Sequence, residues 1–295
     1  MTEPLYRGMD RAELDRQYTA RATVPNVDLY IDAYKERTDE AKALTSPILD
    51  VAFGTSADET CDIYPVDDIT DAPVFVFIHG GYWRALSKDH GGFMAPALAA
   101  AGIATVSVNY GLAPAVNLEE IVAQCRRCLA FLHREGARYG LDPSRIVVGG
   151  SSAGGHLAGM MVTGRWHGLY GVPVDIVKAA MPISGLMDVE PMRLCHVNDW
   201  LSLDAARAAA LSPQHLIEGS PSQAPVVAAV GGLETSEFRR QTHDFASAWA
   251  ASGRRAHSME VPVRNHFDVI FDLADPDTSL YAELLSLFSE SRRAG

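Results

Sequence analysis

The stretch RIVVGGSSAGGHLA, residues 145–158, decides the fold class that this sequence predicts. Its opening, RIVVGG, is a short apolar run of the kind that forms a buried strand. The residues that follow return to a helical pattern. Between the two stands Gly150-Ser151-Ser152-Ala153-Gly154, a G-x-S-x-G pattern at a strand-to-helix turn, which is the context that this pattern requires.

Ser152, the centre of that pattern, is the candidate nucleophile. A sharp turn exposes its hydroxyl above the sheet edge, at a helix N-terminus whose dipole favours developing negative charge. Ser151 is the rival, but as the centre it would require glycine at position 153, where the sequence has Ala153. An ordinary helix cap at Ser152 is the other alternative. The surrounding pattern favours the nucleophile.

Apolar strand-like runs alternate with helical stretches from about residue 45 onward, which is typical of a largely parallel sheet covered on both faces. Strands are expected at 48–54, 61–66, 73–80, 103–109, 145–150, 177–185, 224–232 and 255–262. Helices are expected at about 88–101, 117–139, 152–163, 235–252 and 278–291. With the serine turn, this order predicts an α/β-hydrolase fold: one domain over residues 1–295, with a sheet of about eight strands and a small lid.

Two segments lie outside the alternating pattern. Residues 1–45 are amphipathic and helical in pieces, and we expect them to form part of the lid. Residues 186–222 are irregular and polar, with short helical stretches, and we expect a cap-like insertion that packs over the site.

The strand at 73–78 runs into His79-Gly80-Gly81-Tyr82-Trp83. Two glycines could simply make a turn, but they also let the main chain approach a substrate carbonyl without side-chain obstruction. We predict that the backbone amides of Gly81 and Tyr82, with that of Ala153, form an oxyanion hole. His79 is expected to hold this loop in place by a hydrogen bond.

The base is expected after the last strand, because this fold takes its triad in the order nucleophile, acid, base. His266, in the loop VRNHFDVI, occupies that position. His257 lies within the preceding strand, and His156 follows Ser152 along the nucleophile helix, so both are poorer candidates.

The acid is expected after the strand at 224–232, where Glu234 follows directly. Glu237, in the first turn of the next helix, and Asp188, after the preceding strand, remain alternatives. A serine, histidine and carboxylate in these positions predict acyl transfer through an acyl-enzyme, which needs no metal and no organic cofactor.

Composition excludes several other classes of function. With 25 basic and 37 acidic side chains the formal net charge is −12, so nucleic acid is not expected as a partner. No run approaches the ~18 apolar residues of a membrane helix, and the polar N-terminus does not resemble a secretory signal. We expect a soluble, cytoplasmic protein. Cys125 and Cys128 form a CxxC pair without a second ligand pair, so we expect buried thiols, not a metal site.

HGGYW, GGSSAGGHLA, SGLMDVEP, GGLETSEFRRQ and NHFD together resemble the arylformamidase (kynurenine formamidase) branch of the hormone-sensitive-lipase-like hydrolases. The resemblance covers nearly the whole chain. It implies that the nucleophile falls on Ser152, the base on His266 and the acid on Glu234. The family often has aspartate at the acid position, so Glu234 is a departure from its pattern.

The resemblance implies a small amide or ester substrate, in particular an N-formyl aromatic amine that is hydrolysed to formate and the free amine. A short-chain carboxylesterase is the alternative. A non-catalytic ligand receptor on the same scaffold is a third reading, although such proteins usually lose a triad member. Trp83 and Tyr110, with Tyr82 and Trp200, are expected near the mouth of the site, where they could stack on an aromatic substrate. Except for Trp83, which the motif fixes, they could equally belong to the core. A homodimer is left open.

Overall fold

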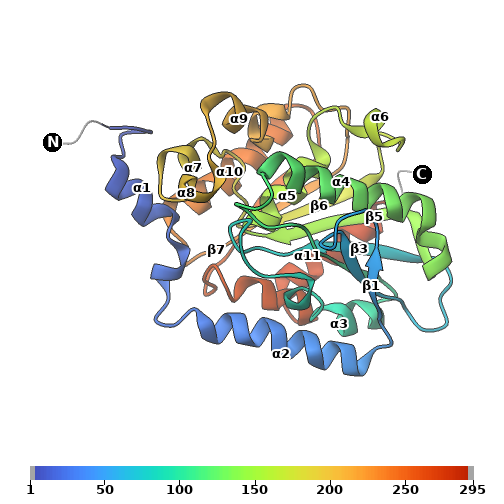
Figure 1. The fold of residues 1–295 in the computed structure, drawn as a ribbon. Coiled ribbons are helices and arrows are strands. Elements are labelled where there is room, and N and C mark those ends of the chain that lie inside the picture. The colour runs from blue at the N-terminus through green and yellow to red at the C-terminus, as the bar shows by residue number, and fades with distance from the viewer. Residues whose placement is uncertain (1–3, 292–295) are drawn as a thin grey trace.

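The computed structural model describes residues 4–291, and these contain one eight-stranded sheet (Figure 1). Its order is β1-β2-β4-β3-β5-β6-β7-β8. β2 runs antiparallel to β1 and β4, and the remaining neighbours pair in parallel. The prediction of a mostly parallel sheet of about eight strands is confirmed. The strands are β1 Ile48–Ala52, β2 Thr60–Tyr64, β3 Ala72–Ile78, β4 Ala104–Val108, β5 Leu141–Ser151, β6 Val177–Ile183, β7 Val226–Gly231 and β8 Ala256–Val261.

Strand register determines which loops meet at the sheet edge. Ile78, the last residue of β3, pairs with Val108 on β4 and with Gly150 on β5. Because these strands are parallel, their carboxyl ends lie at one edge of the sheet, where ligands bind in open α/β sheets. The HGGYW loop after β3 and the serine turn after β5 therefore leave the sheet side by side.

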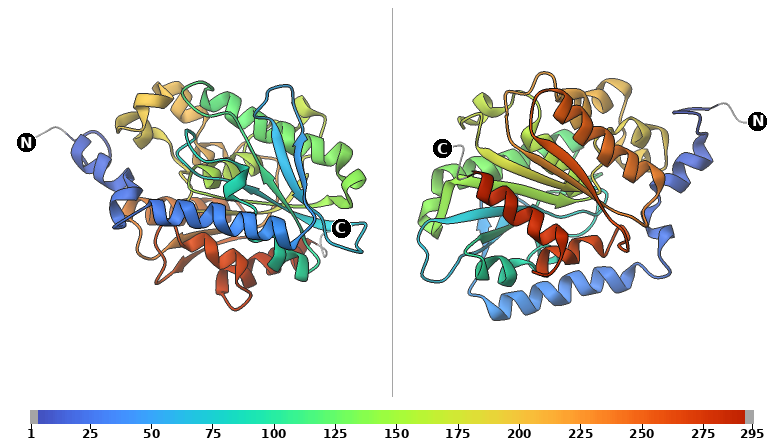
Figure 2. Two further views of the ribbon diagram at one scale, coloured as in Figure 1. Left: turned by 60° about the horizontal axis from the view of Figure 1, so that its bottom comes forward. Right: turned by 180° about the vertical axis from the view of Figure 1, so that it is seen from behind.

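Helices cover both faces of the sheet (Figure 2), and alternation along β3 shows why both faces are apolar. Val74, Val76 and Ile78 belong to one core and Phe75 and Phe77 to the other, as expected for a strand that is buried on both sides. The first core includes α4 Leu118–Glu135, α5 Ala153–Val162 and α10 Ser236–Ala251; the second includes α2 Asp28–Leu44, α3 Ala95–Ala100 and α11 Ser279–Ser291.

Most predicted helices agree with the observed ones to within a few residues. The helix expected at 88–101 is divided: a short 3-10 turn, η2 (Lys88–His90), precedes α3, and Gly91 and Gly92, which are poor helix formers, separate them. β5 begins at Leu141, earlier than expected, because Leu141 pairs with Ala72 before a register shift. Three further short elements are η3 Gly136–Tyr139, α6 His167–Tyr170 and η5 Val269–Ala274.

The two segments outside the alternating pattern carry short helices. The N-terminal segment forms α1 Arg11–Tyr18, η1 Ala20–Thr23 and the long α2, which passes below the sheet in the view of Figure 1. Residues 186–222 form α7 Glu190–Leu194, α8 Asn198–Leu201, α9 Ala205–Ala210 and η4 Pro213–Leu216. This second segment is more apolar inside than its sequence suggests, since Leu186, Met192 and Val197 are fully buried.

No helix within residues 4–291 has both the length and the apolar character that crossing a bilayer would require.

Candidate active site

Ser152 stands at the tight turn between β5 and α5. Its backbone has φ 56° and ψ −116°, a conformation that non-glycine residues rarely adopt. The Ser152 amide donates a hydrogen bond to the Ile183 carbonyl at the end of β6 (2.8 Å), which fixes the turn against the sheet. The side chain is at the N-terminus of α5, as the sequence predicts for this turn.

Glu234 and His266 meet in the loops that follow β7 and β8. Nδ1 of His266 lies 2.5 Å from Oε2 of Glu234, and both side chains are almost wholly buried. The other carboxylate oxygen, Oε1, accepts hydrogen bonds from the Ser184 hydroxyl (2.5 Å) and the Gly231 amide (2.7 Å). An ionised carboxylate accepts hydrogen bonds and cannot donate them. The hydrogen on Nδ1 of His266 is therefore the donor to Glu234, which leaves Nε2 as the basic nitrogen.

Ser152 and His266 line one cavity of about 520 Å³. Among the described hydrogen bonds, none joins the Ser152 hydroxyl to the imidazole, so the structure brings the two groups to one cavity without bonding them. Hydrogen bonds between catalytic groups often tighten only when substrate binds.

The HGGYW loop has an unusual backbone beside Ser152. Gly81, Tyr82 and Trp83 all have positive φ, at 99°, 50° and 58°. A methyl group on Gly81 would overlap the carbonyl oxygen of Ala85, so the turn requires glycine there. The described residues provide no acceptor for the amides of Gly81 and Tyr82, nor for that of Ala153. These are three of the donors that an oxyanion hole would use.

Trp83 and Tyr110 do not line the cavity, and the expectation that they contact substrate is wrong for the side chains as placed. Both are buried, with exposures of 0% and 1%. The Trp83 indole donates to Nδ1 of His156 (3.2 Å), and the Tyr110 hydroxyl donates to the His79 carbonyl (2.9 Å). The polar group of each aromatic ring has a partner, which is a histidine for Trp83 and a backbone carbonyl for Tyr110. Both side chains therefore support the HGGYW loop from within the protein. Tyr82 and Trp200 do line the cavity.

His79 and His156 are buried, neutral supports of the site. Burial lowers the pKa of His79 to about 3 and that of His156 to about 4. His79 donates through Nδ1 to the Gly80 carbonyl (2.9 Å) and stacks on Tyr110. Nε2 of His156 donates to the Leu211 carbonyl (2.7 Å) and thereby joins α5 to the segment that follows α9. Neither ring is placed to act as the base.

The two alternative acids have other partners. Asp188 accepts a hydrogen bond from the Tyr6 hydroxyl (2.7 Å) and from the Glu190 amide (2.9 Å). Glu237 accepts from the Tyr18 hydroxyl (2.9 Å) and forms an ion pair with Arg240 (2.7 Å). Since neither carboxylate contacts His266, the geometry favours Glu234.

The cavity wall contains residues that the sequence did not single out. About a third of its lining comes from the N-terminal segment, and this set is Tyr18, Thr19, Ala20, Arg21, Val27, Asp28, Ile31 and Tyr34. Hydrogen bonds fix this segment: the Tyr82 hydroxyl donates to the Tyr18 carbonyl, and the Thr235 hydroxyl donates to the Gln17 carbonyl (2.7 Å). Such contacts join residues more than sixty positions apart, so no local pattern signals them.

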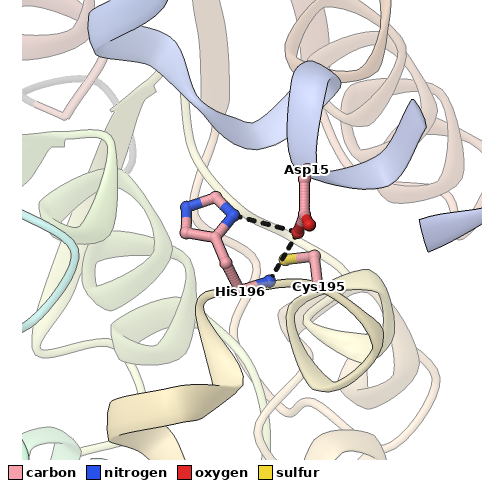
Figure 3. A group of neighbouring side chains, drawn as sticks. All are labelled: Asp15, Cys195 and His196. Carbon is pink, nitrogen blue, oxygen red and sulfur yellow. Dashed lines mark hydrogen bonds and ion pairs between the residues drawn. The ribbon is translucent and has the colours of Figure 1, made fainter. Parts of the chain in front are cut away.

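Asp15, Cys195 and His196 are the one group within residues 4–291 whose side-chain atoms could gather round a metal ion (Figure 3). Asp15 already accepts from the His196 amide (2.7 Å) and from Arg11 (2.9 Å). Burial raises the pKa of the Cys195 thiol to about 12, so it stays protonated, whereas a metal binds the thiolate. The donor set suits a polar junction between α1 and the segment before α8 better than a metal site.

Cys125 and Cys128 are buried and unpaired, as expected for thiols that serve as small apolar side chains. Burial raises the pKa of both thiols, which makes them unreactive.

Comparisons with known proteins agree with this fold. The BD-FAE family pattern matches residues 61–199. The chain is 32% identical to a kynurenine formamidase of Salmo salar, over 97% of this chain and 99% of that protein. It is 29% identical to a kynurenine formamidase of Danio rerio, with the same coverage of each chain. A crystal structure from Silicibacter sp. TM1040, described provisionally as a thioesterase, superposes with a TM-score of 0.79 at 28% identity, covering 92% of this chain and 98% of that one.

The sheet, the serine turn and these relatives define an enzyme of the α/β-hydrolase fold, a serine-hydrolase-type protein that cleaves amide or ester bonds. Within that class, the chain belongs to the kynurenine formamidase family.

Proposed function

We propose that the chain deformylates N-formyl aromatic amines, N-formylkynurenine among them, with Ser152 as nucleophile, His266 as general base and Glu234 as the orienting acid. One observation carries the proposal: His266, bonded to the buried Glu234, lines the cavity that the strained Ser152 also lines. The relatives named kynurenine formamidase support this substrate class. An aromatic substrate also fits the lining, which includes Tyr18, Tyr34, Phe77, Tyr82, Trp200 and Phe267.

Acylation begins when Ser152 Oγ attacks the formyl carbon and passes its proton to Nε2 of His266. Glu234, bonded at Nδ1, stabilises the imidazolium that results. The carbonyl oxygen becomes an oxyanion, for which we assign the amides of Gly81, Tyr82 and Ala153 as donors. The C–N bond then breaks, and His266 gives its proton to the departing arylamine nitrogen.

Deacylation repeats the sequence with water. The water gives a proton to His266 and attacks the formyl carbon of the O-formyl Ser152. The bond to Oγ breaks, Ser152 recovers its proton from His266, and formic acid leaves and ionises to formate in solution. Side chains and backbone amides carry every step.

The test compares kcat/KM for N-formylkynurenine with kcat/KM for p-nitrophenyl acetate, in the wild type and in Ser152→Ala. The proposal predicts efficient deformylation and the loss of both reactions in the variant. Strong ester hydrolysis without deformylation would show that the enzyme is a short-chain carboxylesterase and not a formamidase. The absence of both reactions would favour the ligand receptor.

We also propose that the enzyme is cytoplasmic. A separate proposal is that the N-terminal segment forms part of a lid. All four cysteines are unpaired, which supports a reducing compartment. The contribution of residues 18–34 to the cavity wall supports the lid.

A further inference from the structure

We propose that Arg84 forms a carboxylate-binding subsite at the cavity wall, so that the enzyme selects substrates that carry a carboxylate away from the scissile bond. The inference rests on the proposed function for the choice of reaction. It depends on the placement of one guanidinium group.

The Arg84 side chain is exposed, lines the cavity and stacks on the Trp200 ring, with its guanidinium carbon 4.0 Å from the ring centre. Trp200 is itself fixed, because its indole donates to the Tyr82 carbonyl (3.0 Å). Stacking on an aromatic face leaves the edge of the guanidinium free, and that edge presents the donors that match a carboxylate in pairs. Trp200 therefore holds Arg84 in an orientation suited to a planar anion.

No carboxylate within residues 4–291 forms an ion pair with Arg84, so its exposed guanidinium is available to a bound anion. The other arginine of the cavity wall, Arg21, faces Asp28 at 3.8 Å. In a chain of net charge −12, an anionic substrate needs a local positive charge of this kind to offset the general repulsion.

Arg84 also belongs to the loop that carries the proposed oxyanion donors, two residues after Tyr82. A carboxylate held by Arg84 would thus be anchored on the same rigid loop that binds the reacting carbonyl. Anchoring at a distance from the reacting atoms improves the positioning of the scissile bond.

The test uses two matched pairs of substrates. The first pair is an aryl formamide with a propanoate group para to the nitrogen, and the same compound with a neutral propanamide. The second pair is the corresponding two aryl acetate esters. Each pair differs in charge but hardly in size, so the ratio of kcat/KM within a pair reports recognition of the carboxylate.

For the wild type we expect the carboxylate to be preferred roughly tenfold or more, and less at high salt. Arg84→Met should abolish the preference, mainly by raising KM for the carboxylate member of each pair. Arg84→Lys should retain part of it, because the charge remains without the paired donors. Arg37→Met is the matched control: Arg37 also stacks on an aromatic ring, that of Phe271 (4.1 Å), but does not line the cavity, so the preference should persist.

Equal turnover within both pairs by the wild type would overturn the inference. So would an equal loss on both members in Arg84→Met, which would show that Arg84 only supports its loop. If the esters show an Arg84-dependent preference while the formamides are not cleaved, the subsite stands and the formamidase proposal fails.

Discussion

At the scale of single residues, Glu234 uses its two carboxylate oxygens differently. Oε2 contacts His266, while Oε1 accepts from Ser184 and Gly231. The two donors on Oε1 prevent the side chain from rotating away from the imidazole. The glutamate side chain, one methylene longer than that of aspartate, is therefore held in contact with His266.

We predict that Glu234→Gln lowers kcat roughly 10⁴-fold, because the amide can neither fix the tautomer nor stabilise the imidazolium. Ser184→Ala should lower kcat much less, since the Gly231 amide still holds Oε1. Steady-state kinetics would measure both effects, with unfolding midpoints to show that the fold survives. Near-wild-type turnover in Glu234→Gln, with a large loss in Asp188→Asn or Glu237→Gln, would contradict the assignment. The acid would then be Asp188 or Glu237, whichever variant loses activity.

Position along the chain was enough to predict that three of the proposed site residues would lie at the same edge of the sheet. Ser152, Glu234 and His266 each follow a strand, and parallel strands bring such loops to one edge. Sequence reasoning failed at Trp83 and Tyr110, because adjacency to a motif does not decide which way an aromatic ring points. Here both rings turn inward to satisfied polar partners.

At the scale of elements, the serine turn depends on close packing between α5 and β3. Gly154, in the first turn of α5, faces the end of β3, and a methyl group there would overlap the carbonyl oxygen of Ile78. Because this contact joins two backbone segments, no flexible side chain could move to relieve the overlap. The G-x-S-x-G pattern therefore reflects a packing requirement as well as a strained serine.

Gly154→Ala should accordingly destabilise the protein by roughly 1–3 kcal/mol or more, as overpacking does, and should displace Ser152 from its position. Gly168→Ala in α6 is the control, because a methyl group there meets nothing within 4 Å. It should change stability little, or raise it by up to about 1 kcal/mol. Urea unfolding and kcat would be measured for both; equal, small effects would contradict the packing account.

The elements themselves were largely predictable, because period-2 and helical patterns are local signals. Gly91 and Gly92, which divide the helix expected at 88–101, show the limit of that approach. The cavity wall built by residues 18–34 was not predictable in detail. Its contacts, such as that of Tyr18 with Glu237, join distant parts of the chain and have no local periodicity.

At the scale of the whole molecule, two buried histidines link stability to pH. His79 and His156 are neutral in the folded protein, where burial lowers their pKa to about 3 and about 4. In the unfolded chain each has a pKa of about 6.5. Below that pH the unfolded state binds protons that the folded state does not, so stability falls as the pH falls.

The free energy of unfolding should decline by up to about 1.4 kcal/mol per pH unit for each of these histidines, below about pH 6. In His156→Gln, the pH dependence between about pH 6 and pH 4 should be shallower by about one such slope. Urea unfolding at a series of pH values would measure this, with the pH 7.5 value as each variant's own reference. An unchanged slope in the variant would contradict the assignment of His156 as a buried neutral group.

In the proposed mechanism, the Ser152 hydroxyl is the group that attacks the substrate. Labelling with a fluorophosphonate, followed by intact mass and peptide mapping, tests this most directly. We predict one phosphonyl group per chain, on Ser152, retained in Ser151→Ala and lost in Ser152→Ala. A label on another residue, or no label under conditions where a known serine hydrolase reacts fully, would contradict the account.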